Sequence, residues 1–412
     1  RFLWQKNKID TFRVPVLGVK QKYRRLGIDA YLYYKTYGSL LENKTPFLEM
    51  SWLLEDNKNI LEPLFRLGEK SIKGIASMNE LSHLKGAHAL VTGANGFIGS
   101  HLVDELLAAG CTVHGLVRKS SNLKWLDASR VQLHQVDLSC RDFKIPALEN
   151  LNYIFHCAGL TKAKTRSDFF DVNANACTNL YEQYQKRASQ IKGIIHLSSL
   201  AATGPSPKSG WVDETHPCRP LTFYGQSKLA GEEIAQQFSG SLPITILRPP
   251  VVYGPREENF FNFIKLVHNG WGLQIGAPGK ELSLIYVADL VRAMLTASHP
   301  SQQEGDRYFV TDGQIHAWEQ VAKECACIMN VSLKTLKIPE GFLNPFAWLC
   351  EALARFSSKP ALFDRQRMID IQQSSWSASS DKFYTAFKFK PQYDLKRGLE
   401  QTIKWYQNEK WF

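Results

Sequence analysis

The sequence predicts an α/β fold in which parallel strands form one sheet with helices on both faces. From about residue 86 onward, short apolar runs alternate with amphipathic segments at regular intervals, as parallel α/β sheets require. One of these runs, His88–Thr92, leads through a glycine-rich turn into a helix predicted over Ser100–Ala109. The chain has 412 residues, of which 44% are hydrophobic, so it can bury a large core and form two or three domains.

Further strands are predicted along the same part of the chain. They are the apolar runs Cys111–Val117, Val131–Val136, Ile154–His156 and Ile194–Leu197. The segments before about residue 70 are short and mixed, and they do not follow this pattern. Between the two parts, Ser71–Lys85 is polar and has no strong period, so we expect a linker or a short bridging helix there.

Composition and charge argue against several classes of protein. The net charge is +11, but the basic residues do not gather in one tract with interleaved aromatics, so nucleic acid is not expected as a partner. The charge favours anions instead, either a phosphorylated cofactor or acidic lipid headgroups. The best apolar stretch, Phe342–Phe356, is too short to span a bilayer. The eight cysteines show no zinc-binding spacing, so we expect buried thiols, a cytoplasmic location and no metal.

The glycine-rich turn predicts a dinucleotide site. Gly93, Gly96 and Gly99 follow the strand His88–Thr92 directly and open the next helix. The first glycine permits a tight turn, the second lets the backbone approach a pyrophosphate, and the third lets the helix pack closely on the strand. The phosphates would then bind the free N–H groups at the positive end of the helix. Strand, turn and helix in this order favour an NAD(P)-binding, Rossmann-type domain.

The end of the second strand indicates which nicotinamide cofactor is bound. Arg118 and Lys119 stand where an NAD enzyme usually carries an acidic residue, and a guanidinium suits a 2′-phosphate. We therefore expect NADP, with NAD as the alternative if these two are only exposed loop charges. Asp137 ends the next strand and is expected to reach the adenine amine. All predicted cofactor-binding residues are Gly93, Asn95, Gly96, Phe97, Ile98, Gly99, Arg118, Asp137, Leu138, Ala158, Gly159, Lys228, Pro249 and Val251.

A serine, a tyrosine and a lysine form the candidate catalytic centre. Ser199 follows the strand Ile194–Leu197, and Tyr224 and Lys228 are spaced to lie on one face of a helix, one turn apart. The lysine ammonium is expected to lower the tyrosine pKa toward neutrality, which makes Tyr224 a usable acid or base. Ser199 would hydrogen-bond the reacting oxygen, and Lys228 would also hold the nicotinamide ribose.

With these motifs, residues 86–412 resemble the extended short-chain dehydrogenase/reductases, the NAD(P)-dependent epimerase/dehydratase group. The matching segments are Thr92–Gly99, His156–Gly159, Val172–Asn173, Ser198–Ser199, Tyr224–Lys228, Leu247–Pro255 and Tyr286–Asp289. The resemblance implies that Ser199, Tyr224 and Lys228 are catalytic and that Asn173 supports their hydrogen-bond network. It also implies a nucleotide-binding domain over 86–250, a small substrate lobe over 251–412 interleaved with the last strands, and a homodimer.

Two substrate classes within this group stay open. A sugar-nucleotide epimerase or dehydratase is one, and a reductase of a ketone on a larger, apolar molecule is the other. Arg118 favours the reductase, because reductive biosynthesis draws on NADPH. Leu282–Tyr286 is apolar where sugar-nucleotide enzymes often carry an arginine, and Leu200-Ala201 replaces the Asp-Glu typical of dehydratases. In the expected reaction, hydride passes to a ketone carbon and Tyr224 donates a proton to the oxygen.

Residues 1–75 are predicted to form a separate segment, joined to the rest of the chain by a linker over 76–85. Arg13–Val19 is predicted as a strand, Gln21 begins a helix, and with Glu49–Asn57 they resemble the C-terminal half of a GNAT-type N-acetyltransferase. The alternative is a helical appendage that packs on the reductase. An acyltransferase beside an extended reductase resembles bacterial sphingolipid synthesis, which suggests a 3-ketosphinganine or 3-oxoceramide as substrate.

Two hypotheses from other classes are a non-catalytic cofactor-sensing protein and a protein whose main activity is acyl transfer. The expected partners are a small-molecule or lipid substrate, and a membrane surface contacted peripherally on its inner side. Aromatic and aliphatic residues from Phe346 to Phe356 recur at helical spacing in the lobe, and basic residues lie among them. They predict either an ordinary lobe core or an apolar mouth that admits an acyl chain.

Overall fold

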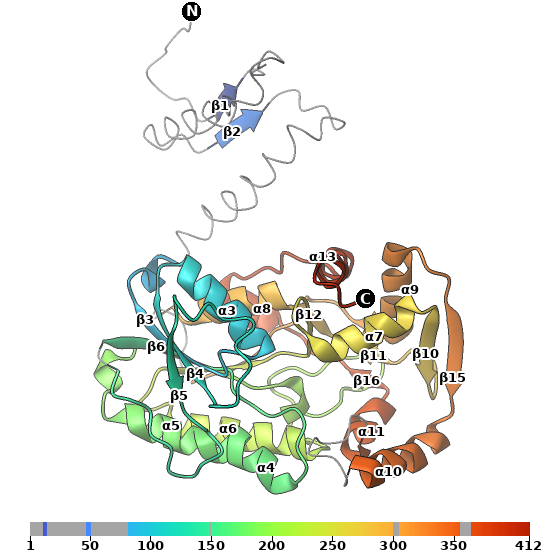
Figure 1. Cartoon of the computed structure of the whole chain (residues 1–412), viewed down its shortest axis with the longest axis horizontal. Helices are drawn as coiled ribbons and strands as arrows, with labels where there is room; N and C mark the ends of the chain where they lie inside the picture. Colours follow the sequence, from blue (N-terminus) through green and yellow to red (C-terminus); the bar gives the residue numbers. More distant parts are fainter. Residues whose placement is uncertain (1–10, 15–46, 51–80, 149, 300–304, 355–363) are drawn as a thin grey trace, which may run out of the picture. The chain divides into compact units, whose positions relative to one another are not determined.

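The computed structural model describes residues 11–14, 47–50, 81–148, 150–299, 305–354 and 364–412 (Figure 1). The chain divides into two compact units, Arg1–Asn79 and Glu80–Phe412. In the first unit, strands β1 (Thr11–Val14) and β2 (Phe47–Met50) pair in parallel. The predicted strand Arg13–Val19 overlaps β1, whereas the helix predicted from Gln21 lies outside the described residues, as do residues 71–80 of the predicted linker. A short 3₁₀ turn, Ser82–Leu84, precedes the main sheet.

A seven-stranded sheet forms the centre of the second unit, in the order β13-β8-β7-β6-β3-β4-β5 with every pair parallel. The strands are β3 (His88–Thr92), β4 (Thr112–Val117), β5 (Gln132–Gln135), β6 (Leu151–His156), β7 (Gly193–Leu197), β8 (Ile244–Arg248) and β13 (Arg307–Phe309). From β3, the sheet grows in one direction through β4 and β5 and in the other through β6, β7 and β8. Ligands of such sheets bind at the carboxyl ends of the strands, where the direction reverses. The predicted Rossmann-type α/β fold is confirmed.

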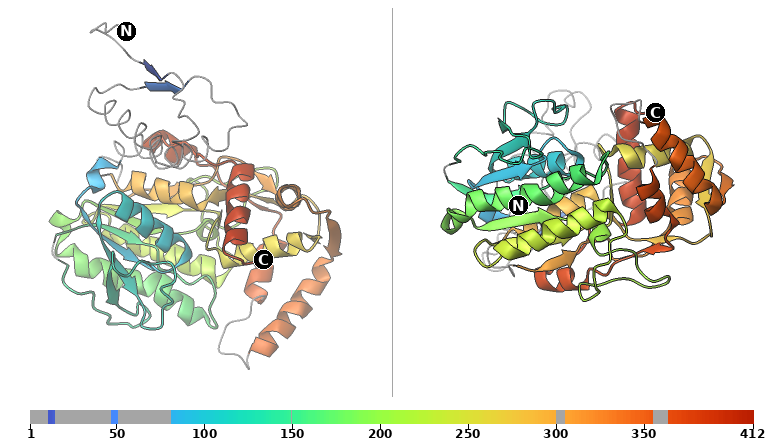
Figure 2. Two further views of the ribbon diagram at one scale, coloured as in Figure 1. Left: turned by 45° about the horizontal axis from the view of Figure 1, so that its top comes forward. Right: turned by 90° about the horizontal axis from the view of Figure 1, so that it is seen from below.

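Helices cover both faces of this sheet (Figure 1). On one face lie α3 (Phe97–Ala108) and α8 (Val287–Ala297), and on the other lie α4 (Arg166–Phe170), α5 (Ala176–Gln185) and α6 (Phe223–Phe238). Figure 2 shows α5 and α6 side by side across the sheet. Strand side chains alternate between two apolar clusters, so that Val91 packs with the α3 side and Leu90 with the α5 side. The predicted start of the first helix at Ser100 is wrong, because α3 already begins at Phe97.

Most residues after 250 form short strands and helices outside the seven-stranded sheet, and we refer to these elements as the lobe, whereas β13 and α8 belong to the main sheet layer. The lobe elements are β9 (Val251–Tyr253), α7 (Glu258–His268), β10 (Trp271–Ile275), β11 (Glu281–Leu282), β12 (Leu284–Tyr286), β14 (His316–Ala317), α9 (Trp318–Met329), β15 (Lys334–Ile338), α10 (Leu343–Ala354), α11 (Arg365–Gln372), β16 (Ser375–Trp376), α12 (Asp381–Phe387) and α13 (Leu395–Asn408). Leu343 and Ala347 of α10 pack with Met368 of α11 in a small apolar cluster. Among the described residues, no helix is long and apolar enough to cross a membrane.

Candidate active site

The turn between β3 and α3 exposes backbone N–H groups at the carboxyl end of β3. Gly93 has a φ of +66°, which favours glycine, and a Cβ there would lie 2.9 Å from the Ala158 Cα. Gly96 is the N-cap of α3 and brings no capping side chain, so the N–H groups of the first helical turn remain available to a ligand. A Cβ on Gly99 would lie 2.1 Å from the Gly93 carbonyl oxygen. Gly99 therefore lets α3 pack against the turn itself rather than against the strand.

A cavity of about 450 Å³ lies at the carboxyl ends of β3, β4 and β6. Such a volume is typical of small-molecule sites. The predicted cofactor-binding residues that line it are Gly93, Asn95, Gly96, Arg118, Asp137, Leu138, Ala158 and Gly159. The predicted residues outside this lining are Phe97, Ile98, Gly99, Lys228, Pro249 and Val251. An open helix N-terminus beside a glycine-lined cavity fits the pyrophosphate of a nicotinamide dinucleotide.

Two basic residues stand next to this cavity, of which Arg118 lines it and Lys119 does not. Arg118 and Lys119 are exposed after β4 and line a shallow hollow together with Asp137. The Asp137 Oδ1 accepts hydrogen bonds from the Ser139 amide at 3.0 Å and the Ser139 hydroxyl at 2.7 Å. These bonds, aided by the charge of Arg118, lower the pKa of Asp137. One oxygen of Asp137 is thus occupied, and only the other can make the predicted contact with the adenine amine.

The helix α6 carries both Tyr224 and Lys228, one turn apart. It begins at Phe223, where Thr222 caps it by accepting a hydrogen bond from the Gly225 amide. A Cβ on Gly225 would lie 2.4 Å from the Ala201 carbonyl oxygen, so glycine here allows α6 to approach the segment that follows β7. The first turn of α6, and Tyr224 with it, is therefore held against that segment.

Ser199 lies on that segment, near enough to the phenol of Tyr224 for its hydroxyl to lower the pKa of the phenol. It caps the 3₁₀ turn η5 (Leu200–Ala202), and its Oγ accepts a hydrogen bond from the Ala201 amide at 3.2 Å. The serine and tyrosine hydroxyls are thus neighbours, as two groups that bind one substrate oxygen need to be.

Burial raises the pKa of Tyr224, the Ser199 hydrogen bond lowers it, and the charge of Asp370 raises it further. The net direction is opposite to the lowering by Lys228 that the sequence predicted. Burial outweighs the hydrogen bond, and the Lys228 Nζ donates to the Leu197 carbonyl oxygen at 2.6 Å. Tyr224 is therefore a protonated phenol at neutral pH, which is the form needed to donate a proton.

The Lys228 amine lies beside the cofactor cavity but within a nearly neutral interior. A Cβ on Gly159, which lines the cavity, would lie 3.7 Å from the Lys228 Nζ. Burial lowers the pKa of Lys228, while it raises the pKa of the Cys157 and Cys177 thiols to about 12. Burial also lowers the pKa of His156 to about 3. These neighbours are uncharged at neutral pH, whereas the charge of Glu232 raises the pKa of Lys228 and so opposes the effect of burial.

Three of the buried groups behind Lys228 lie close together, although the sequence predicted no metal. Ligand atoms of His156, Cys177 and His196 are within 4.8 Å of one another, which is close enough to hold a metal ion. The two rings also have hydrogen-bond partners, since His156 bonds the Thr92 hydroxyl at 2.8 Å and His196 bonds the Tyr181 hydroxyl at 2.7 Å. The group therefore links β3, β6, β7 and α5 beneath the site.

Asn173 connects the loop after β6 to α6. It lies in a π-helical turn, Asp171–Asn175, between α4 and α5, a distortion that often marks functional positions. Its Oδ1 accepts from the Leu160 amide at 2.7 Å, and its Nδ2 donates to the Leu160 carbonyl at 3.0 Å and to the Ser227 hydroxyl at 2.9 Å. The structure thus brings Asn173 to the predicted network through Ser227.

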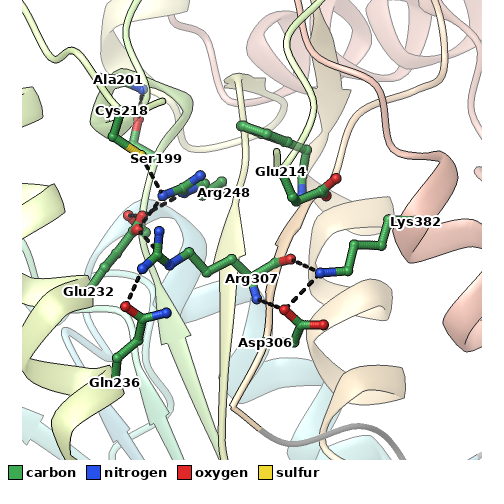
Figure 3. Close-up of polar contacts among 12 residues, drawn as sticks. Ser199, Ala201, Glu214, Cys218, Glu232, Gln236, Arg248, Asp306, Arg307 and Lys382 are labelled. Atoms are coloured by element: carbon green, nitrogen blue, oxygen red, sulfur yellow. Dashed lines mark hydrogen bonds and ion pairs between the residues drawn. The ribbon is translucent and has the colours of Figure 1, made fainter. Parts of the chain in front are cut away.

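A buried ion pair joins α6, the helix that carries Tyr224 and Lys228, to the end of β8 (Figure 3). Arg248 donates to both carboxylate oxygens of Glu232, at 2.9 and 2.6 Å, and neither side chain is exposed to solvent. Ser198 also hydrogen-bonds Glu232, and Arg307 approaches it at 3.7 Å. Burial and these contacts hold α6 in place relative to the strand that precedes Ser199.

The family to which this site belongs follows from comparison with known proteins. Residues 89–310 match the model of the NAD dependent epimerase/dehydratase family. The chain belongs to this family. It is an NAD(P)-dependent enzyme of the short-chain dehydrogenase/reductase type, as the sequence predicted. The matched residues begin after residue 75, so the family match does not support the acetyltransferase likeness of residues 1–75.

Three relatives illustrate the range of the family. A "Ceramide reductase" of Caulobacter vibrioides is 25% identical over 327 residues, which is 78% of this chain and 95% of the relative. A "UDP-glucose 4-epimerase" of Vibrio cholerae is 26% identical over 76% of this chain and 93% of the relative. The crystal structure of a UDP-glucose 4-epimerase from Thermotoga maritima superposes with a TM-score of 0.64 at 21% identity, covering 78% of this chain and 99% of that one.

Sequence reasoning missed several residues that build the site. Gly225 and Gly231 allow close packing of α6, since a Cβ on Gly231 would lie 2.2 Å from the Asn173 carbonyl oxygen. Their signal was visible in the sequence, because glycine inside a predicted helix usually has a packing reason. The pairing of Glu232 with Arg248 and the position of Asp370 near Tyr224 depend on tertiary contacts and left no local signal.

Proposed function

We propose that the chain is an NADPH-dependent ketoreductase that acts on a lipid-like ketone of the 3-ketosphinganine or 3-oxoceramide type. The observation that carries this proposal is the placement of the Ser199 hydroxyl near a protonated Tyr224, one turn from Lys228. Lys228 in turn lies next to Gly159, in the lining of the cavity that Arg118 also lines. A protonated phenol suits reduction, in which a ketone oxygen gains a proton.

The residues of the site have separate tasks in this reaction. A bound nicotinamide supplies the hydride that forms the new C–H bond at the ketone carbon. Tyr224 donates its hydroxyl proton to the ketone oxygen, so that the C=O group becomes an alcohol. Ser199 donates a hydrogen bond to the same oxygen as its charge develops. Lys228 presents an ammonium next to Gly159, where it can hold a ribose hydroxyl and favour the phenolate left on Tyr224.

The preference for NADPH rests on the charges at the cavity rim. Arg118 and Lys119 are both exposed and are ready to form charge-assisted bonds with a 2′-phosphate. The carboxylate of Asp137 stands near them, but its Oδ1 is engaged by Ser139. This arrangement favours an anion over a ribose hydroxyl at the rim.

Two features support a lipid-like ketone. The ceramide reductase of Caulobacter vibrioides matches this chain over nearly the whole length of that relative. The stretch Leu282–Tyr286 is buried, and none of its side chains offers a cation to a diphosphate.

Phe342 and Trp348 are exposed on and beside α10, at 68% and 63%. They support the expected contact of the lobe with a membrane surface, where such a substrate would reside.

A second candidate is a sugar-nucleotide epimerase. Lys162 lines the cavity, and the charge of Arg367 on α11 acts on its pKa, so two cations lie near the substrate side of the site. They are suited to a diphosphate. Carboxylates compete with such a ligand, however, because Glu257 and Asp364 act on both cations.

A turnover panel separates the two candidates. The purified protein is incubated with NADPH or NADH and with 3-ketosphinganine, 3-oxoceramide or UDP-glucose, and the products are identified by mass spectrometry. We expect reduction of a long-chain ketone with NADPH as the better cofactor. Conversion of UDP-glucose without net oxidation of the cofactor would overturn the proposal in favour of the epimerase.

A further inference from the structure

The lobe helix α11 contacts the first turn of α6, the turn that carries Tyr224. The Gln366 Oε1 accepts a hydrogen bond at 2.8 Å from the amide of Phe223, the first residue of α6. Asp370 lies four residues after Gln366 and therefore on the same face of α11. The charge of Asp370 acts on the pKa of the Tyr224 phenol, which places the carboxylate near the reacting group.

Asp370 differs from the other buried carboxylates near the site because one of its oxygens is unsatisfied. The Oδ1 of Asp370 is buried and has no hydrogen-bond partner within the described part of the chain. Glu232, by contrast, receives bonds from Arg248 through both oxygens, and Asp289 receives the amides of Gln392 and Tyr393. Buried acceptors in folded proteins are nearly always paired, and an exception in a site points to a missing ligand.

The charged groups around Asp370 do not supply the missing hydrogen-bond donor. Burial raises its pKa to about 7, the charge of Asp364 raises it, and the charge of Arg367 lowers it. Arg367 thus interacts with Asp370 through space, but Oδ1 remains without a donor. At neutral pH the carboxyl group is ready to accept a hydrogen bond, and binding a donor would favour its ionised form.

We propose that Asp370 is a specificity-determining residue that accepts a hydrogen bond from a donor on the substrate beside the reacting carbonyl. This inference rests on the proposed function, because the donor is located relative to the oxygen that Tyr224 protonates. In an amino ketone the donor is the ammonium or amide N–H on the neighbouring carbon. In a hydroxylated substrate it is an O–H group. An apolar ketone with neither group leaves the Asp370 Oδ1 buried and unpaired in the complex, which disfavours binding.

The test compares two substrates in three proteins. The substrates are 3-ketosphinganine and a ketone of the same chain length that lacks the amino and hydroxyl groups. The proteins are wild type, Asp370→Leu and Glu400→Gln. Glu400 is an exposed carboxylate on α13, outside the lining of the cavity, so its replacement serves as the control. NADPH binding by each protein checks that it is folded, and Asp370→Asn replaces Asp370→Leu if the latter does not fold.

We expect Asp370→Leu to lower kcat/KM for 3-ketosphinganine by about 10- to 100-fold, the effect of one hydrogen bond to a charged group. Activity on the donor-free ketone should stay within about threefold of wild type or rise, and Glu400→Gln should match wild type on both ketones. An equal loss on both ketones would overturn the inference, because Asp370 would then serve only to position α11. If wild type reduces neither ketone, the proposed function itself is wrong and the inference fails with it.

Discussion

Tyr224 lies between two regions of the molecule that differ in how their buried carboxylates are hydrogen-bonded. On the sheet side, Lys228 is enclosed by neutral thiols and imidazoles, and both carboxylate oxygens of Glu232 are bonded to Arg248 in a buried ion pair. On the lobe side, Asp370 retains a buried oxygen without a hydrogen-bond partner among the described residues. The carboxylate on the sheet side has its donors within the chain, whereas the carboxylate on the lobe side lacks a donor that a substrate could bring.

This difference separates the parts of the site by task. The sheet side holds the reacting groups at fixed positions and is expected to work alike on any ketone that reaches Tyr224. The lobe side is expected to determine which of those ketones bind, because its unpaired acceptor favours substrates that carry a hydrogen-bond donor. Substitutions on the sheet side should therefore lower turnover of every substrate or destabilise the fold. Substitutions on the lobe side should lower turnover of some substrates and not of others.

The largest effect is expected from Tyr224→Phe, which removes the proton donor at the centre of the comparison. Turnover should fall by about 10²- to 10⁴-fold, the range for loss of a general acid, while the NADPH dissociation constant stays unchanged. Steady-state kinetics and fluorescence titration measure the two quantities. Tyr184→Phe is the matched control, since the Tyr184 hydroxyl is buried in α5 without a hydrogen-bond partner. Full activity of Tyr224→Phe would show that another group supplies the proton.

A large loss of stability is expected from Arg248→Met on the sheet side. The change leaves Glu232 buried without its main partner, and breaking such a pair lowers the free energy of unfolding by about 3–5 kcal/mol. Arg365→Met is the control, because Arg365 pairs with Glu351 at the surface and is 66% exposed. Exposed pairs contribute about 0–1 kcal/mol. Urea denaturation that gives the same loss for both variants would contradict the role of the buried pair.

A smaller and more selective effect is expected at the cavity rim. Arg118→Ala should raise the KM for NADPH by about 10- to 100-fold, because a charge-assisted bond to the 2′-phosphate is lost, and should leave the KM for NADH unchanged. Arg130 is exposed and lies outside both hollows, so Arg130→Ala should alter neither constant. If Arg118→Ala raised the KM for NADPH and the KM for NADH equally, Arg118 would not bind the 2′-phosphate.

A pH dependence of stability is also expected on the lobe side. Burial, with the charge of Asp364, raises the pKa of Asp370 from 3.8 to about 7. Between these values the folded chain keeps a proton that the unfolded chain has released, so this group makes stability fall as pH rises through the window. Asp370→Asn has no such proton. Its unfolding free energy should exceed that of wild type by up to about 4 kcal/mol at pH 8 and match it near pH 4.

Melting temperatures of the two proteins across that pH range measure the effect. The other charged or titratable groups that act near Asp370 are Tyr224 on α6, Arg367 on α11 and Asp364 at the N-cap of α11. The substitution keeps all three residues and removes the charge that acts on the pKa of Tyr224 and of Arg367. Curves for wild type and Asp370→Asn that run parallel from pH 4 to pH 8 would contradict the raised pKa.

The sheet side could largely be predicted from sequence because its signals are local. The glycine turn, Ser199 after a strand, and Tyr224 one turn before Lys228 are each defined within a few residues, and parallel strands bring such segments to one edge. The predicted direction of the Tyr224 pKa was wrong, since burial and the bond of Lys228 to Leu197 are tertiary features.

The lobe side could not be predicted in the same way. Asp370 reaches Tyr224 only because Gln366 docks on Phe223, a contact between residues 143 positions apart. Leu282–Tyr286, which the sequence used to distinguish substrates, is buried in the core, so it excludes a cation without itself forming a binding surface. The acetyltransferase likeness of residues 1–75 stays a prediction, because only two short strands of that segment are described.

The most direct test of the central claim is the fate of the hydride. NADPH carrying deuterium at the transferable position of the nicotinamide is mixed with 3-ketosphinganine and the wild-type enzyme, and the product is analysed by mass spectrometry. The account predicts one deuterium bound to the former ketone carbon, with one NADPH oxidised per alcohol formed. An unlabelled product, or no ketone reduction together with interconversion of UDP-glucose at constant NADPH, would contradict it.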